Sequence, residues 1–360
     1  MDIAVKIFAD LSERDIADLR ALQQADPAHN SPFYAPDFSR AIHVAGKPVH
    51  VALISDDRKL IGALPFHKGR LGTGVPVGGQ ISDYQGVIGP SKTSFETSKL
   101  LKACGLKSYD FNHLPIDQIV LAKGKFHTAV SPYIDLSDGF ESYLAKRRAK
   151  KNKVLKNAIR NLRILERDIG KVRVEIEDKD EDVWPQLVKW KNKSFDQMGV
   201  VSILNVPWAR TAFEHIRTTQ SSHFAGVISS LYVDNKLAAT HFGMRSDKTL
   251  HWWFPTYDVN LAKYSPGIVL LLEVARRAPN IGLTKIDLGR GSQPYKKAFA
   301  NGETILCEGS VERSASLGGS LRVLRKSIDK SLARSPRLAK PALFQRRAFN
   351  RIMGAVYLGK

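Results

Sequence analysis

Cysteine is scarce in this chain: Cys104 and Cys307 are the only two among 360 residues, and no CxxC or HxxxH spacing accompanies them. This scarcity argues against a disulfide framework and against a zinc site. Long apolar runs are missing as well, since none approaches the roughly 20 residues that span a bilayer. The first residues, MDIAVKIFADLSERDIADLR, lack the basic and apolar regions of a secretory signal. We therefore expect a cytoplasmic protein that binds no metal ion and does not cross a membrane.

Acidic residues are few compared with basic ones: 35 Asp and Glu against 55 Lys and Arg give a net charge of +20. Residues 139–168 hold 10 Lys and Arg against 3 acids, and residues 313–360 hold 12 against 1. The rest of the chain is nearly neutral. The positive charge therefore belongs to two segments and is not a general coat.

Two regions of the chain repeat one order of elements. The second region begins with the strand-like VRVEIE, continues with two helical patterns and a three-strand meander, and ends with a helix, a strand and a last strand, TILCEGSVE. The meander has short polar turns at residues 234–235 and 246–247, which are typical of hairpins. The first region looks like a weaker copy, and its first helix, Leu11 to Gln24, has Ser12 as N-cap. The order predicts an α+β fold.

These patterns divide the chain into four parts. We expect an N-terminal domain over residues 1–138, a basic connecting helix over 139–170, a second domain over 171–315 and a basic amphipathic tail over 316–360. The connecting segment predicts one long helix from 140 to 168, which either bridges two domains in solvent or binds a polyanion. The tail is either disordered or forms two short helices suited to an anionic lipid surface.

The stretch IDLGRGSQPYKKAF, residues 286–299, resembles a nucleotide-binding loop at first sight, because Gly289 and Gly291 flank Arg290 after a strand. A dinucleotide fingerprint requires a third glycine where this chain has Pro294, and a P-loop requires GK[ST]. The stretch therefore fails both tests. A cation between two glycines still suits close approach to a phosphate or carboxylate.

The stretch YSPGI offers a better anion site. Ser265 is a suitable cap, Pro266 suits the first helical turn and Gly267 leaves the backbone open, so the amides up to Ile268 and Val269 are predicted to face an anion such as a pyrophosphate. The alternative is a plain capped helix that packs its leucines into the core.

The meander, the capped helix and the strand ending in Asp287 follow the order of a GNAT acyltransferase core. The elements LAATHFG, YSPG with LLEVARRA, and IDLGRGSQPYKKAF resemble the CelD/BioF2-like branch of that superfamily, and LIGALPFHKG with GGQISDYQGVIG resembles its N-terminal pattern. The same order is similar to the Fem-type aminoacyltransferases. The resemblance implies two tandem GNAT-like domains with mixed, largely antiparallel sheets, and acetyl-CoA as the acyl donor, held at residues 265–268.

Acyl transfer from a thioester needs a base for the acceptor proton and an acid for the leaving thiolate. Asp287 is a candidate base or a holder of the acceptor's ammonium, although it also suits a loop-capping carboxylate. His241 is a second catalytic candidate, because its small neighbours Ala239 and Gly243 would leave room for a substrate; a buried histidine is the alternative. Tyr295 is a candidate acid by resemblance, or it packs in the core.

Five further side chains are candidates for substrate binding. Arg290 and Lys296 are expected to bind an anionic group of the donor or acceptor. Trp253 and its neighbour face opposite sides of one strand, so that Trp253 lines a sugar or acyl site or joins the core. Asp83 and Tyr84 are candidates because DYQG matches the pattern of the family, with a turn as the alternative.

The resemblance implies an acyl-CoA-dependent acyltransferase that acetylates an amino sugar or a sugar hydroxyl during extracellular polysaccharide biosynthesis, as in the cellulose-associated CelD group. Its acceptor would be a sugar or a lipid-linked saccharide, met in the cytoplasm at the inner face of the plasma membrane, with residues 316–360 on an anionic membrane surface. One alternative is a Fem-type transferase in cell-wall synthesis, the only reading that requires a nucleic acid, tRNA. Another is a non-catalytic GNAT-fold assembly subunit. Fold alone does not decide among them.

Overall fold

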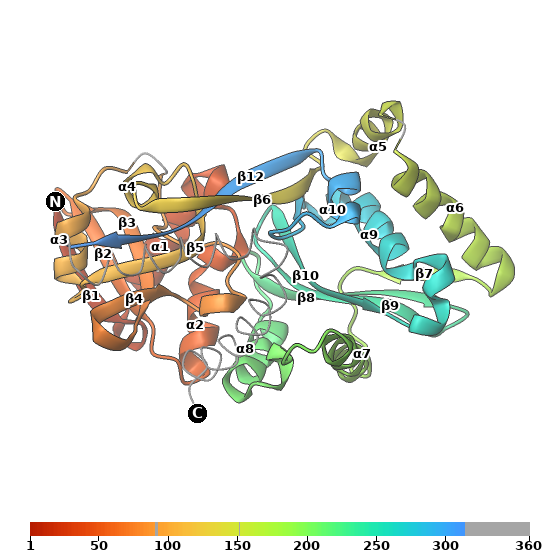
Figure 1. The fold of residues 1–360 in the computed structure, drawn as a ribbon, viewed down its shortest axis with the longest axis horizontal. Coiled ribbons are helices and arrows are strands. Elements are labelled where there is room, and N and C mark those ends of the chain that lie inside the picture. The colour runs from red at the N-terminus through yellow and green to blue at the C-terminus, as the bar shows by residue number, and fades with distance from the viewer. Residues whose placement is uncertain (91–92, 151, 314–360) are drawn as a thin grey trace, which may run out of the picture.

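A computed structural model describes residues 1–90, 93–150 and 152–313. Twelve strands form one continuous sheet in the order β1-β2-β3-β4-β5-β12-β6-β11-β10-β9-β8-β7 (Figure 1). The strands are β1 (Asp2–Ile7), β2 (His50–Asp56), β3 (Lys59–Lys68), β4 (Thr73–Pro76), β5 (Ser108–Pro115), β6 (Lys125–Asp135), β7 (Val172–Glu175), β8 (Ala225–Val233), β9 (Lys236–Arg245), β10 (Thr249–Tyr257), β11 (Lys285–Asp287) and β12 (Gly302–Glu312).

The sheet has two equivalent halves. Strands β1 to β6 and strands β7 to β12 follow the same order of elements along the chain, and in each half the fourth and fifth strands pair in parallel while their neighbours pair antiparallel. This confirms the internal repeat and the tandem α+β fold expected from the sequence. The fold is therefore two copies of one unit joined edge to edge.

The two halves exchange their last strands. β12 lies between β5 and β6, and β6 lies between β12 and β11, so each six-stranded arm is completed by a strand from the other half. The central pair is antiparallel over most of its length, from Gly302 opposite Tyr133 to Glu308 opposite His127. Figure 1 shows both strands crossing the middle of the molecule. Because neither arm is complete alone, the halves are held in one fixed arrangement.

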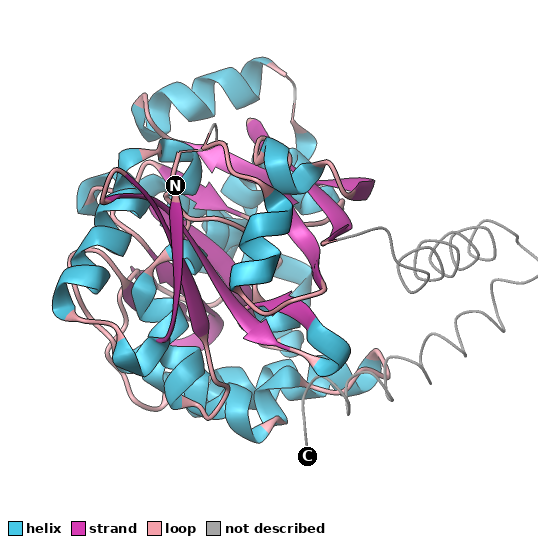
Figure 2. Ribbon diagram, turned by 90° about the vertical axis from the view of Figure 1, so that its left-hand side faces the viewer, coloured by secondary structure: helices cyan, strands magenta, loops and turns pink. Residues whose placement is uncertain are grey.

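Helices cover both faces of the sheet (Figure 2). They are α1 (Glu13–Ala25), α2 (Pro36–Val44), α3 (Thr97–Ala103), α4 (Ile119–Ala122), α5 (Gly139–Ala149), α6 (Lys153–Asp168), α7 (Val183–Gln197), α8 (Pro207–Thr218), α9 (Pro266–Arg277) and α10 (Pro294–Phe299). The start of α1 agrees with the prediction, because Ser12 Oγ accepts a hydrogen bond from the amide of Asp15 at 3.1 Å in a capping box.

One hydrophobic core joins the two halves. It contains Phe38 of α2 and Phe213 of α8, packed with residues of β2 and β3 from the first half and of β8 to β10 from the second. Two further cores lie elsewhere: one under α5, α6 and α9, the other around α3 and β5. Since burying one aromatic side chain contributes roughly 1.5–3 kcal/mol, the shared core and the exchanged strands together fix how the halves meet.

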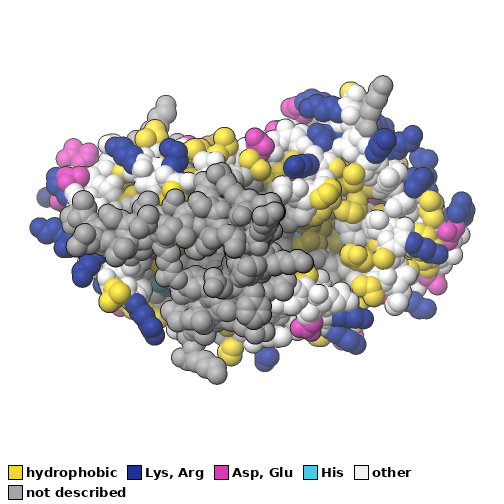
Figure 3. All heavy atoms as spheres, in the orientation of Figure 1, with side chains coloured by type: hydrophobic (Ala, Val, Ile, Leu, Met, Phe, Trp, Pro, Cys, Tyr) yellow, Lys and Arg dark blue, Asp and Glu magenta, His cyan; other side chains and the backbone are white. Residues whose placement is uncertain are grey.

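The single helix expected over residues 140–168 is two helices, α5 and α6. The chain breaks because Asn152 begins a new helix, its side chain accepting a hydrogen bond from the amide of Leu155 at 3.1 Å. Arg147 and Asn152 also both bind the carbonyl of Ala298, which ties the break to the end of α10. Lysine and arginine side chains gather over α5 and α6, at the upper right of Figure 3.

No helix within the described part of the chain is long and apolar enough to cross a membrane. The predicted amphipathic tail, residues 316–360, lies outside the described residues.

Candidate functional site

The site lies where strands β10 and β11 part. They pair in parallel over three positions only, the last of which joins His251 to Asp287. Beyond it β10 continues to Tyr257, paired with β9 alone, and a β-bulge between His251 and Phe254 interrupts that pairing. The edge of β10 that faces β11 therefore has no strand partner over residues 252–257 within the described chain. β-Bulges are frequent beside active sites, because they re-aim side chains.

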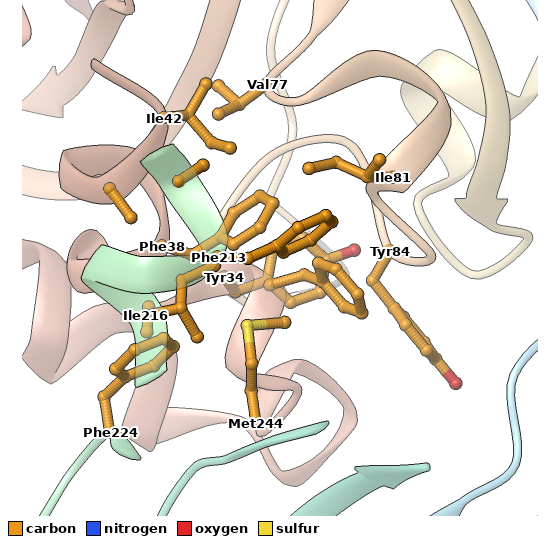
Figure 4. Packing of buried hydrophobic residues seen from close by; sticks show 14 of the residues in the cluster. Tyr34, Phe38, Ile42, Val77, Ile81, Tyr84, Phe213, Ile216, Phe224 and Met244 are labelled. Atoms are coloured by element: carbon orange, nitrogen blue, oxygen red, sulfur yellow. The ribbon is translucent and has the colours of Figure 1, made fainter. Parts of the chain in front are cut away.

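Asp287, at the end of β11, is buried, and both of its carboxylate oxygens accept hydrogen bonds. Its Oδ2 accepts from the Tyr84 hydroxyl at 2.5 Å, and its Oδ1 accepts from Ser131 Oγ at 3.0 Å and from the Gly289 amide at 2.8 Å. The hydroxyl of Tyr84 points out of the shared core in Figure 4. Burial raises the pKa of Tyr84, and the Asp287 carboxylate raises it further. The predicted role of Asp287 as a direct base is therefore wrong for this geometry, because only 2% of its side chain is exposed and both oxygens carry donors.

Asp83 links the first half to the same strands. Its Oδ2 accepts a hydrogen bond from Nε2 of His251 at 2.9 Å, and Nδ1 of that ring lies 3.6 Å from Oδ1 of Asp287. His251 thus stands between two carboxylates from opposite halves. Burial would raise the pKa of Asp83, but the hydrogen bond from His251 and nearby positive groups outweigh burial and lower it. Asp83 and Tyr84 therefore join the two halves and do more than form a turn.

His113, on β5, completes the cluster on its more open side. Its Nε2 lies 3.7 Å from Oδ1 of Asp83, and its Nδ1 donates to Oδ1 of Asn112 at 2.9 Å. Gln85 holds this pair in place: its Oε1 accepts from the amides of Asn112 and His113, and its Nε2 donates to Asn112 Oδ1 at 2.8 Å. Burial lowers the pKa of His113.

The glycine-flanked turn adopts the backbone expected of it. Gly289 and Gly291 have φ of 71° and 143°, in the region that favours glycine. A Cβ on Gly289 would stand 2.9 Å from Oδ2 of Asp83, so the absence of a side chain at this position leaves room for the Asp83 carboxylate. Lys296 Nζ donates to the carbonyls of Gly289 and Arg290 at 3.0 and 3.2 Å, and burial lowers its pKa.

The side chain of Arg290 reaches the first half, where it donates to the carbonyl of Asn112 at 2.8 Å and lies 4.0 Å from Glu308. Lys296 thus stabilises the turn, and Arg290 links the turn to the first half of the molecule. Binding of an anionic substrate by either side chain stays a prediction. The Lys296 ammonium has three N–H donors, so one is left for such a substrate besides the two that bind carbonyls.

The start of α9 differs in detail from the anion site expected there. Ser265 occupies the N-cap position, but its side chain does not cap the helix: its φ and ψ are both 52°, and the side chain makes no capping hydrogen bond. Pro266 has no N–H, and the amides of Ile268 and Val269 donate to the carbonyl of Ser265 at 3.0 and 3.1 Å. Of the first four helical residues, Gly267 alone has an amide without a described intramolecular partner. Space beside it is open apart from the Tyr257 ring, 3.4 Å from where a Cβ would stand. The start of α9 therefore fits an anionic group of the acyl donor at the Gly267 amide, which is fewer backbone amides than predicted.

His241 was expected to face a substrate, and this prediction is wrong. The ring is completely buried, stacks on Trp252 at 3.8 Å between centroids, and accepts a hydrogen bond from the Trp253 amide at 3.1 Å. Gly243 leaves space for this ring itself, because a Cβ there would stand 2.7 Å from it. Burial lowers the pKa of His241 well below its usual range, so the ring stays neutral.

The buried neutral His241 predicts acid sensitivity. A histidine whose pKa is lower in the folded than in the unfolded state stabilises the fold above pH about 6.5 and loses that contribution as the pH falls. We expect His241→Gln to make the melting temperature less dependent on pH between pH 7.5 and 5.5, measured by circular dichroism. A variant with the same pH slope as wild type would contradict this, whatever its absolute stability.

The two remaining candidates pack rather than line an open site. Trp253 contacts the rings of Phe33 and Phe213 at 5.4 and 5.2 Å between centroids, against the shared core, while Trp252 faces the opposite core. The prediction that the two face opposite sides is thus confirmed, and Trp253 is partly buried and packs against the shared core. Tyr295 packs beside the core under α9, and burial raises its pKa to about 12, which keeps the phenol protonated as an acid must be.

The structure brings Asp83, Tyr84, Asp287, Arg290 and Lys296 together, although the first two come some 200 positions earlier in the chain. It adds two residues that sequence reasoning missed, His251 and His113. Each is a single histidine in a strand, and no motif marks either of them. No group of three or more His, Cys, Asp or Glu in the described chain is arranged to hold a metal ion.

Comparisons with known proteins agree with this architecture. Residues 149–297 match the family model of an acetyltransferase (GNAT) domain. Among solved structures, FemX is similar with a TM-score of 0.56 and 9% identity, over 90% of this chain and 99% of that one. The C-terminal domain of a lysylphosphatidylglycerol synthetase from Agrobacterium fabrum is similar with a TM-score of 0.53 and 10% identity, over 88% and 96%.

L-PGS from Bacillus licheniformis is similar as well, with a TM-score of 0.51 and 10% identity, over 86% of this chain and 96% of that one. At such identities these likenesses concern the fold alone. No curated protein sequence gives a significant match. The matched domain runs from before α6 into α10 with the strands between them, including the open edge of β10, the start of α9 and Asp287. Residues 149–297 therefore match an acetyltransferase (GNAT) domain, and the chain as a whole is similar in fold to FemX.

Proposed function

We propose that this protein transfers an acetyl group from acetyl-CoA to an amino sugar or a sugar hydroxyl during extracellular polysaccharide biosynthesis. The observation that carries the proposal is the open edge of β10 beside Gly267. An unpaired strand edge offers backbone donors and acceptors to the extended arm of an acyl-CoA, and the start of α9 offers the Gly267 amide and the positive end of the helix dipole to its pyrophosphate.

The acceptor side of the proposed reaction is the cluster at the junction. Asp83 and His113 are its accessible members, with 21% and 13% of their side chains exposed. The other members hold these two in place: His251 binds Asp83, Asp287 binds Tyr84, and Gln85 fixes the amides beside His113. A fixed set of polar groups at the end of the cofactor edge suits an acceptor with donor groups, such as a sugar. Tyr295, protonated at neutral pH, is proposed to supply the proton that the departing thiolate takes up.

A Fem-type function is the second candidate, favoured by the basic surface of α5 and α6. Six of its basic side chains are exposed and make no described ion pair: Arg148, Lys150, Lys153, Lys156, Arg160 and Arg163. This surface suits a polyanion such as tRNA, and binding to it would weaken steeply with salt. A saccharide carried on a lipid, a membrane contact through residues 316–360 and a place at the inner face of the plasma membrane stay proposals for the first function.

Turnover separates the two functions. Release of the CoA thiol from acetyl-CoA, followed with a thiol reagent, is expected to depend on an added amino sugar or sugar acceptor. Release that requires no acceptor, or transfer that proceeds from charged tRNA and not from acetyl-CoA, would contradict the proposed function. Mass spectrometry of the cell's polysaccharide, with and without the gene, identifies the missing acyl group.

A further inference from the structure

The open edge of β10 lacks a backbone hydrogen-bond donor at Pro255. This residue stands opposite His241 on β9, and three positions further along the same register the amide of Asp258 donates to the carbonyl of Ala238 at 2.9 Å. Bonded and non-bonded pairs alternate in an antiparallel ladder, so the backbone groups of Pro255 and Tyr257 point away from β9, toward the open edge. Proline has no N–H, and of these two residues Tyr257 alone carries a backbone donor.

A lysine side chain reaches this part of the edge. Lys191 on α7 donates from Nζ to the carbonyl of Pro255 at 3.0 Å. It continues the core-facing stripe of the helix, four residues after Leu187 and seven after Trp184, both of which are buried. An amphipathic helix has apolar residues at such positions. The lysine instead brings an ammonium to the open edge of β10, beside the carbonyl that points there.

The ammonium of Lys191 has unused N–H donors. Of its three N–H groups, one binds the Pro255 carbonyl, and among the described residues no other hydrogen bond and no ion pair of this side chain is formed. The ring of Phe195 lies 5.4 Å from Nζ in a cation–π contact. Burial lowers the pKa of Lys191 to about 8. A partly buried cation with free donors and no counter-charge requires an acceptor from outside the chain.

We propose that Lys191 replaces the missing amide of Pro255 and donates a hydrogen bond to an amide carbonyl in the extended arm of acyl-CoA. The inference rests on the proposed function and adds a binding residue from α7 to it. A chain that pairs with a strand edge requires donors and acceptors in alternation. At Pro255 the ammonium supplies the donor, and the second lone pair of the carbonyl accepts from an N–H of the arm.

The position of Lys191 assigns it to the arm of the donor and not to the reacting carbon. Pro255 lies four residues after His251, where β10 and β11 part beside the polar cluster. With one of those residues in the bulge, Pro255 stands about 10 Å from the cluster. The acyl carbon has to lie beside the acceptor, at the cluster. Lys191 therefore holds the donor equally before and during the reaction, so its loss raises KM and leaves kcat unchanged.

The charge of Lys191 gives donor binding a pH dependence. α7 packs against β9 and β10, and the titratable group on these strands that faces Lys191 is His241, whose ring stays neutral. On α7 itself, Lys189 and Lys193 are exposed. The ammonium is therefore charged at pH 7 and loses its proton as the pH rises through about 8. Because a charged donor binds more strongly than a neutral one, we expect the affinity of wild type for acetyl-CoA to fall about fivefold from pH 7 to pH 9.

Three variants of the whole protein test the inference by calorimetric titration with acetyl-CoA. Lys191→Met removes the donors and suits the apolar stripe of α7, Lys191→Arg keeps a charge that does not titrate, and Lys193→Met, on the exposed face of the same helix, is the matched control. At pH 7 we expect Lys191→Met to bind acetyl-CoA about 10-fold more weakly, with KM raised by a similar factor and kcat unchanged. Lys191→Arg should keep its affinity from pH 7 to pH 9, and Lys193→Met should match wild type.

Three results would overturn the inference: equal affinity in Lys191→Met and wild type, a lower kcat with unchanged affinity in Lys191→Met, or an affinity of Lys191→Arg that falls with pH as in wild type. Each of them leaves binding of acetyl-CoA to wild type in place. Failure of the proposed function shows separately, as a wild type that binds no acetyl-CoA.

Discussion

Asp287→Asn is expected to lower kcat for acetyl transfer about 1,000-fold and to change the melting temperature little. Asparagine keeps the shape of the side chain and still accepts from Ser131 and the Gly289 amide, but it removes the negative charge beside His251 and the strong acceptor of the Tyr84 hydroxyl. Loss of a fixed charge in a buried site weakens the positioning of the acceptor groups, where small shifts are costly. Steady-state kinetics measure the expected fall in kcat, and thermal unfolding measures the melting temperature.

Asp287→Ala separates charge from structure. It leaves the donors of Tyr84, Ser131 and Gly289 without their acceptor, and each buried unsatisfied group costs about 1–3 kcal/mol. We therefore expect this variant to lose both activity and several kcal/mol of unfolding free energy, unlike the asparagine variant. Ser131→Ala, which removes one donor and no charge, is the matched control and should keep most of its activity. Full activity in Asp287→Asn would show that the buried carboxylate serves the fold alone.

Gly289→Ala is the second variant with a large expected effect. The new methyl group would stand 2.9 Å from Oδ2 of Asp83, the atom that His251 binds, on a backbone with φ of 71°. Either the carboxylate or the turn must move, and a shift of about 1 Å at a catalytic cluster lowers turnover roughly 100-fold or more. The melting temperature should also fall, because alanine in this left-handed region costs about 1–2 kcal/mol.

Gly282→Ala is the control for backbone strain. Gly282 has a similar φ of 81°, but nothing lies within 4 Å of the position its Cβ would take. Both variants should lose similar stability, measured as the free energy of unfolding in denaturant, while Gly289→Ala alone loses activity. Equal activity in the two variants would show that Asp83 need not rest on Gly289.

The sequence predicts the fold better than the site, because the signals for the helices, strands and turns come from residues that are close together along the chain. Polar turns between alternating apolar runs, the capping box at Ser12 and the repeated order of elements each depend on neighbours along the chain. The exchange of β6 and β12 has no such signal, since it depends on how two similar edges meet. The break at Asn152 was also missed, because an amphipathic pattern continues across it.

The site depends on that exchange of strands and on the shared core. Asp287 and Arg290 could be identified from their motif, whereas His113 and His251 become partners of Asp83 only once the two halves are joined. His241 shows the opposite error: small neighbours at Ala239 and Gly243 predicted an open imidazole, but the space they leave is filled by the ring itself and by backbone. Sequence spacing gives the face of a strand and not what covers it.

The central claim is that the open edge of β10 and the start of α9 bind acyl-CoA, and calorimetric titration with acetyl-CoA tests it most directly. Gly267→Val suits the comparison, because its Cβ would make an ordinary 3.4 Å contact with Tyr257 while covering the amide of residue 267. We predict saturable one-to-one binding to wild type at moderate salt, weakened about tenfold or more in Gly267→Val. No binding of acetyl-CoA to wild type, or equal affinity in the two proteins, would contradict the account.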